Sequence, residues 1–177
     1  PWKGQKIFIE SMKLLSDKSD IPPFQSIILG SDQGRNVYRK QLLVLTQQHR
    51  LGKIIKFIDH CNEMPVAYGL ANLVCSCSTE PEAFGRISVE AQSMQIPIIA
   101  SDIGGSRETI IDGKTGYFFK NKDPNSLADS IVMVMQKDYS SSKSIGFEGR
   151  KNVLKRFDVD KMCQTTFTEY KKLIKLS

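Results

Sequence analysis

The chain contains EPEAFGRISVEA at residues 80–91, followed by PIIAS at residues 97–101 and by further turns that contain glycine. Two carboxylates in the first segment, Glu82 and Glu90, are separated by seven residues and flank a Phe-Gly pair. The apolar spacing after that pair predicts a helix over 84–95, and the short apolar run at 97–100 predicts a buried strand. Carboxylates beside a helix start, at the edge of a parallel sheet, suit a ligand with several hydroxyls and a phosphate.

The rest of the chain repeats this alternation of short apolar strands and amphipathic helices. Such alternation, with short loops, implies right-handed βαβ units and a parallel sheet covered on both faces. The predicted fold is therefore α/β, a Rossmann-like parallel sheet with helices on both faces. Helices are predicted at 4–17, 35–51, 62–69, 84–95, 105–111, from 123 onward, 145–156 and 158–175, strands at 25–29, 54–58, 73–76, 97–100 and 117–119, and a polar joint at 139–144.

Polar residues follow several of the predicted strands. Asp59 and His60 come after the second strand, residues 78–84 after the third and residues 101–105 after the fourth. Parallel sheets bind ligands beyond the carboxyl ends of their strands. These loops are therefore expected to share one ligand-binding edge.

Length and composition indicate a single globular domain, assigned to residues 1–177. Hydrophobic residues make up 40% of the chain, and no apolar run approaches the roughly 20 residues needed to cross a bilayer. The formal charge of +6 favours anionic partners such as phosphates or acidic lipid headgroups. Nucleic acid is not an expected partner, because the basic C-terminal segments do not interleave aromatic residues with their charge.

The four cysteines are Cys61, Cys75, Cys77 and Cys163. Cys75 and Cys77 lie two apart in an apolar run, on one face of a predicted strand, and are expected to be buried free thiols. The sequence has no zinc-type spacing, P-loop or Ser/His/Asp set. Neither a metal nor another cofactor is expected, and the cytoplasm is the expected compartment.

The segments around Glu82 and Glu90 resemble the donor-binding region of the retaining glycosyltransferases of family 4, which have the GT-B fold. The resemblance extends from Lys3-Gly4 to the final helix, and includes Gly104-Gly105 and the turn at 113–116. It implies that the chain is the C-terminal half of a GT-B enzyme, the half that binds a nucleotide sugar as substrate.

The resemblance also implies roles for three charged side chains. Glu82 would contact hydroxyls of the donor sugar and orient its ring. Glu90 would contact the ribose, where a carboxylate can accept hydrogen bonds from two neighbouring hydroxyls. Lys3 would reach the diphosphate and offset the charge on the leaving group.

Other positions are expected to contribute backbone or less direct contacts. The backbone of Phe84, Gly85 and Arg86 would lie near the sugar and the phosphate. His60 ends a predicted strand and is expected near the nucleobase. For Gly104-Gly105, direct ligand contact and simple turn geometry are both open.

The sequence departs from the family pattern in three places. The strand and the phosphate-binding Arg expected before Lys3 are absent, so the sheet is expected to have a gap that leaves backbone groups unpaired. Gln95 stands where a Gly is usual, in the turn before Pro97. Arg86 replaces a more common aliphatic residue.

These features predict a domain that transfers a sugar with retention from a nucleoside diphosphate to a hydroxyl acceptor. The expected setting is bacterial lipopolysaccharide or polysaccharide synthesis, with a glycan or glycolipid acceptor and peripheral contact with the inner face of the membrane. Acceptor residues would belong to an N-terminal GT-B domain, so this chain alone is expected to be inactive. The alternative is a non-catalytic split or decayed fragment that at most binds nucleotide. A sugar-nucleotide epimerase or a phosphorylase fits less well, because the expected acidic residues or pyridoxal-binding Lys are not evident.

Overall fold

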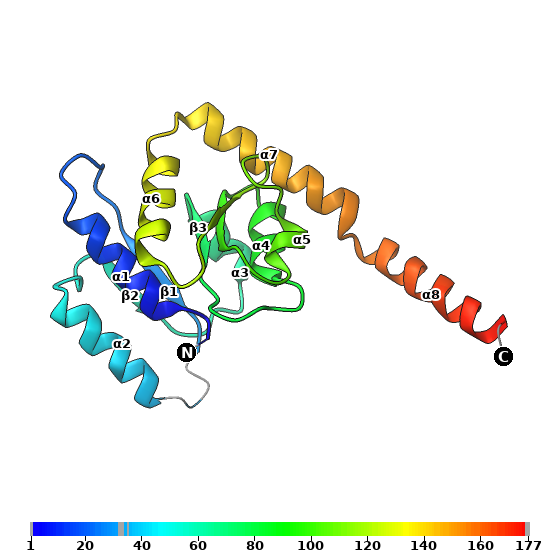
Figure 1. The fold of residues 1–177 in the computed structure, drawn as a ribbon, viewed down its shortest axis with the longest axis horizontal. Helices are drawn as coiled ribbons and strands as arrows, with labels where there is room; N and C mark the ends of the chain where they lie inside the picture. The colour runs from blue at the N-terminus through cyan, green and yellow to red at the C-terminus, as the bar shows by residue number, and fades with distance from the viewer. Residues whose placement is uncertain (1, 32–33, 35, 176–177) are drawn as a thin grey trace.

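The computed structural model describes residues 2–31, 34 and 36–175 and has an α/β fold (Figure 1). The order of its helices and strands confirms the predicted alternation. The elements are α1 (Gln5–Ser16), β1 (Ser26–Leu29), α2 (Asn36–Gln48), β2 (Ile55–Ile58), α3 (Met64–Gly69), β3 (Val74–Ser76), α4 (Arg86–Ser93), β4 (Ile98–Ser101), α5 (Ser106–Thr109), β5 (Tyr117–Phe119), α6 (Pro124–Met135), α7 (Tyr139–Arg156) and α8 (Val159–Lys175).

The strands form two parallel sheets. β1 pairs with β2, with Ser26 opposite Ile55, and β4 lies between β3 and β5, with Ile99 opposite both Cys75 and Tyr117. Within the described residues no backbone pairing joins the first sheet to the second. The structure therefore has the predicted gap in its sheet.

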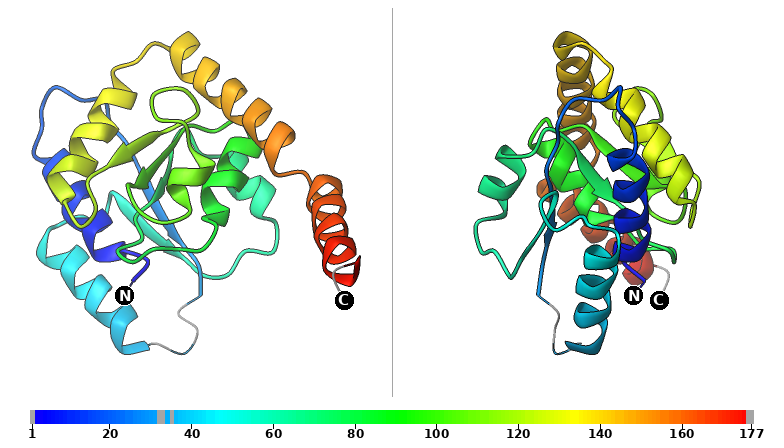
Figure 2. Two further views of the ribbon diagram at one scale, coloured as in Figure 1. Left: turned by 45° about the vertical axis from the view of Figure 1, so that its right-hand side comes forward. Right: turned by 90° about the vertical axis from the view of Figure 1, so that its left-hand side faces the viewer.

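Helices cover both faces of the strands. α1, α2 and α6 lie on one side, and α3, α4 and α5 lie on the other (Figure 2). The main core contains Ile9 and Met12 of α1 and Leu127 of α6 together with Ile55 of β2 and Ile99 of β4. Because this core includes residues of both sheets, the layer of α1 and α6 holds the two sheets together, and the predicted fold class is confirmed.

The free cysteines have different environments. Cys77 is buried, Cys75 and Cys61 are partly buried, and Cys163 is exposed on α8. Burial raises the pKa of the Cys75 thiol to about 12 and raises that of Cys77. Both thiols are therefore protonated, and Cys77 is buried as the spacing predicted, whereas Cys75 is only partly buried.

The polar joint predicted at residues 139–144 is wrong, because these residues form the start of α7. Asp138 caps the helix, and its carboxylate accepts a hydrogen bond from the Ser141 N–H. Serine is unfavourable in a helix interior but well suited to the first turn, where its side chain can serve free N–H groups. The serine run therefore marks a helix start.

The last helix, α8, projects away from the rest of the fold (Figure 1). All residues from Val159 to Ile174 are exposed. Over the described part of the chain, no helix combines the length and apolar character needed to span a bilayer.

Candidate functional site

The start of the chain lies against the end of β3. A Cβ at Gly4, whose φ is 71°, would overlap the carbonyl oxygen of Cys77, so only glycine allows this approach. The Trp2 carbonyl accepts a hydrogen bond from the Thr79 N–H at 2.7 Å. These contacts bring the Lys3 ammonium to 2.9 Å from Glu82 Oε1.

The Glu82 carboxylate is well shielded, with a side chain only 16% exposed. Its Oε1 accepts hydrogen bonds from both the Lys3 ammonium and the Ser78 hydroxyl. Lys3 in turn lies over the Trp2 ring, 4.1 Å from its centroid. The carboxylate is thus paired and fixed in orientation, with Oε2 unused by these two partners.

Gly104 and Gly105 pack against the backbone of the loop that carries Glu82. The Gly105 N–H donates to the Glu82 carbonyl at 2.8 Å. A Cβ at Gly104 would lie 2.8 Å from the Glu82 nitrogen and 2.8 Å from its carbonyl oxygen, and one at Gly105 would lie 2.6 Å from the Phe84 carbonyl carbon. This close packing positions the loop between β3 and α4.

α4 begins directly after that loop. Gly85 is its N-cap, in the left-handed region with φ 76°, which glycine adopts without steric cost. The Phe84 side chain is 44% exposed, and its ring meets that of Phe157 edge-on with centroids 5.4 Å apart. The free N–H groups of the first turn of α4 are available to an anion or a hydroxyl.

Glu90 lies one turn further along α4. Its Oε2 accepts a hydrogen bond from the Tyr68 hydroxyl at 2.8 Å, and its Oε1 accepts one from Arg86 at 3.0 Å. Burial, and next the hydrogen bond to Glu90, raise the pKa of Tyr68. Tyr68 is therefore a protonated donor to this carboxylate throughout the neutral range.

A buried polar network connects α4 to α5 and α7. The Gln92 amide donates to the Ser88 and Thr109 carbonyls, and the Asn152 amide donates to Gln92 Oε1 and to the Thr109 carbonyl. Arg156 donates to the Glu108 carbonyl at 2.8 Å. Because buried polar groups are costly to leave unpaired, this network fixes α4 relative to α5 and α7.

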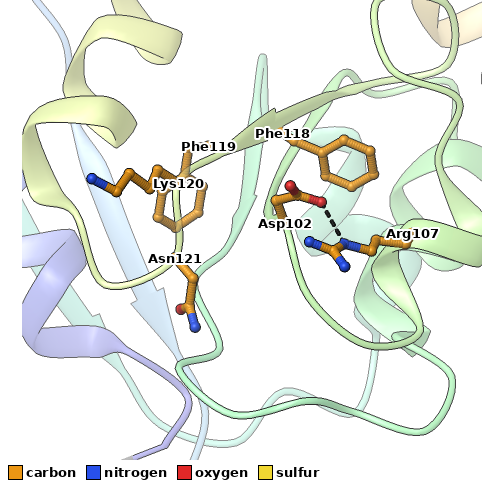
Figure 3. Close-up of a pocket in the computed structure, with 6 residues that line it drawn as sticks. All are labelled: Asp102, Arg107, Phe118, Phe119, Lys120 and Asn121. Atoms are coloured by element: carbon orange, nitrogen blue, oxygen red, sulfur yellow. Dashed lines mark hydrogen bonds and ion pairs between the residues drawn. The ribbon is translucent and has the colours of Figure 1, made fainter.

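An open depression of about 420 Å³ lies at the carboxyl ends of β4 and β5. Asp102 and Arg107, which form an ion pair at 2.7 Å, lie on one side of it, and Lys120 and Asn121 lie on the other (Figure 3). The Asn121 amide donates to the Thr79 carbonyl. The depression therefore adjoins the loop that carries Glu82, although neither Glu82 nor Glu90 lines it.

Comparison with known proteins decides the family. Residues 1–152 match the family described as glycosyl transferases group 1. The chain belongs to this family.

Relatives and solved structures agree with that assignment. The chain is 28% identical over 156 residues to the capsular polysaccharide biosynthesis glycosyltransferase CapM of Staphylococcus aureus, covering 88% of this chain and 39% of CapM. Anabaena HepE, solved with UDP and glucose, superposes with a TM-score of 0.88 at 28% identity, over 97% of this chain and 46% of HepE. The C-terminal domain of LpcC from Francisella tularensis superposes with a TM-score of 0.78 at 27% identity, over 89% of this chain and 81% of that domain.

These comparisons identify the fold as that of a GT-B glycosyltransferase. The chain spans less than half the length of CapM and of HepE. It matches most of the isolated C-terminal domain of LpcC.

The structure brings several of the predicted site residues together. Lys3 contacts Glu82, the Gly104-Gly105 turn packs on the loop from Glu82 to Phe84, and Glu90 follows on the helix that this loop enters. Their roles toward a ligand stay predictions. Glu80, two residues before Glu82, is exposed.

His60 is placed differently. It is exposed after β2, and neighbouring Asp59 forms an ion pair with Arg39 of α2. Across the described residues, no hydrogen bond or ion pair joins His60 to Lys3, Glu82 or Glu90. Its proximity to a nucleobase stays a prediction.

Sequence reasoning missed two hydroxyl donors, Ser78 and Tyr68. Ser78 stands four residues before Glu82, a spacing that suggests a local contact across the loop. Tyr68 precedes Glu90 by 22 residues, and nothing in the sequence indicates that these side chains meet. No cluster of three or more His, Cys, Asp or Glu side chains able to hold a metal occurs in the described ranges.

Proposed function

We propose that this domain binds a nucleoside-diphosphate sugar and, within a longer GT-B enzyme of family 4, transfers the sugar with retention to a hydroxyl acceptor. The observation that carries the proposal is the pair of fixed carboxylates on one loop and helix, Glu82 beside Lys3 and Glu90 on α4. HepE, which was solved with UDP and glucose, has the same fold over almost the whole of this chain.

The proposed chemistry divides the donor between the charged groups. Lys3 binds the diphosphate and offsets charge on the leaving group, while Glu82 accepts hydrogen bonds from the sugar hydroxyls through Oε2. Glu90 accepts from the ribose hydroxyls, and the first turn of α4 contributes N–H groups near the sugar and phosphate. Sugar transfer is then a displacement on one face, with neither a covalent enzyme intermediate nor a metal.

The proposed acceptor is a glycan or glycolipid of a bacterial envelope, a polysaccharide or a lipopolysaccharide. CapM, named for capsular polysaccharide biosynthesis, supports the polysaccharide reading. The chain alone binds the donor but transfers nothing, because the acceptor residues belong to the N-terminal domain. The basic side chains of α7 and α8 favour contact with an acidic membrane surface, and the proposed location of the enzyme is the cytoplasmic side of that membrane.

Nucleotide binding tests the ribose role. Replacing Glu90 by Gln removes a charge-assisted hydrogen bond and should weaken binding of UDP, GDP or ADP, whichever the chain binds, by on the order of 1.5–3 kcal/mol. Calorimetry on the 177-residue chain measures this. Glu169→Gln is the matched control, since Glu169 is exposed on α8, where it forms an ion pair with Lys172. Unchanged affinity in Glu90→Gln for every nucleotide bound by the wild type contradicts the ribose role.

A second comparison isolates the sugar role of Glu82. Glu82→Gln should weaken binding of UDP-glucose, GDP-mannose or ADP-glucose about tenfold or more, and the matching nucleoside diphosphate much less, because a bare diphosphate carries no sugar. The same calorimetric series measures both ligands. Equal losses for the two would assign Glu82 a structural role.

A further inference from the structure

Tyr68 and Arg86 both donate hydrogen bonds to the Glu90 carboxylate, but the two donors differ in how deeply they are buried. Tyr68, which donates to Oε2, is only 7% exposed. It packs in a second, smaller hydrophobic core with Ala91, Ile98 and Ile110. Arg86, on Oε1, has a side chain that is 83% exposed. A buried ring keeps its position, whereas an exposed guanidinium exchanges readily with water or ligand.

This asymmetry leaves one carboxylate oxygen for a ligand. Oε2 is occupied by a donor that cannot move away without breaking core packing. Oε1 becomes available once Arg86 is displaced, and the Glu90 side chain is 35% exposed, so a ligand can reach it. Arg86 lies in the first turn of α4, where its guanidinium can pair with a bound diphosphate in place of Glu90.

We propose that Tyr68 is a positioning residue that fixes the Glu90 carboxylate so that Oε1 faces the ribose of the bound nucleotide. The proposal rests on the proposed function, in which Glu90 is the ribose ligand. The phenol orders a flexible glutamate before binding, and a preorganised acceptor loses less conformational freedom when the ligand arrives. Tyr68 touches no ligand itself.

The test uses Tyr68→Phe, which keeps the buried ring and removes only the hydroxyl. Calorimetry should show that this variant binds UDP about tenfold more weakly than wild type, as expected for loss of a hydrogen bond to a charged group. Binding of 2′,3′-dideoxyuridine diphosphate, which lacks both ribose hydroxyls, should be unchanged. Tyr170→Phe is the control, because Tyr170 is exposed on α8, the helix that projects from the fold.

A double-mutant cycle links the effect to Glu90. In a Glu90→Gln background, adding Tyr68→Phe should cause no further loss of UDP affinity, since residues acting through one group are not additive. Circular dichroism and thermal unfolding of each variant check that the fold is retained.

The outcomes separate this inference from the proposed function. Loss of UDP binding in Glu90→Gln, with none in Tyr68→Phe, overturns the positioning role and leaves the function standing. Equal losses for UDP and its dideoxy analogue in Tyr68→Phe also overturn it, because they indicate a general structural effect. UDP binding that is insensitive to Glu90→Gln overturns the function itself.

Discussion

At the scale of single residues, the turn before β4 has an unusual conformation. Gln95 has a φ of 61°, in the left-handed region, where a side chain costs roughly 1–2 kcal/mol. This is the position at which the family resemblance led us to expect glycine. Glycine removes that strain but costs roughly 0.5–1 kcal/mol of extra chain entropy on folding.

Gln95→Gly should therefore stabilise the chain by up to about 1.5 kcal/mol. Gln136→Gly is the control, since Gln136 has an ordinary φ of −81° at the end of α6 and should lose stability on the same change. Urea unfolding of the two variants measures the difference. A loss of stability in both would mean that the Gln95 backbone carries no significant strain.

The sequence predicts the charged residues that the structure brings together, but not the side chains that orient them. Lys3, Glu82 and Glu90 belong to recognisable local motifs. Ser78 and Tyr68 act through contacts that depend on tertiary packing, and for Tyr68 the two partners come from separate helices. A hydrogen bond between side chains that are distant in sequence leaves no spacing pattern from which it could be predicted.

At the scale of elements, α7 and α4 pack closely. A Cβ at Gly146 of α7 would overlap the carbonyl oxygen of Gln95, and one at Gly149 would lie 3.0 Å from the Gln92 Cγ. Asn152 continues the contact through its bond to Gln92. The two glycines therefore mark a helix interface, although in sequence they appear unfavourable within a helix.

Gly146→Ala should destabilise the chain by about 1–3 kcal/mol, because overpacking against a backbone atom exceeds the helix propensity that alanine gains. Gly52→Ala provides the comparison, as a Cβ there meets nothing within 4 Å, and it should be neutral or slightly stabilising. Thermal and urea unfolding report both. Similar effects of the two substitutions would show that α7 is free to shift away from α4.

At the scale of the whole molecule, the alternation of strands and helices was sufficient to predict the fold class, whereas the gap in the sheet was predicted from the family resemblance. Periodicity does not predict which surface an apolar helix face packs against. α8 has the clear apolar stripe of a buried helix, yet its large apolar side chains are 59–73% exposed. The pattern indicates that a face is suited to packing, but it does not say against what.

The exposed stripe of α8 has two consequences for the chain as a whole. A chain that ends at Asp158 should keep its urea midpoint, because no residue from Val159 to Ile174 is buried. The same truncation should reduce self-association, since exposed apolar patches promote it. Sedimentation velocity and urea unfolding of the two chain lengths measure these effects.

Point variants test whether the apolar face of α8 mediates the self-association expected of it. The double variant Phe167→Glu with Leu173→Glu places charge on the apolar stripe and should abolish association. The double variant Thr165→Glu with Thr168→Glu adds the same charge to the polar face and should retain more of the association. Both pairs keep the length of the helix, so a difference between them reflects the face and not the added charge. A lower urea midpoint in the truncated chain would mean that α8 packs on the fold in solution. Equal association of the two double variants would mean that the apolar stripe does not mediate association.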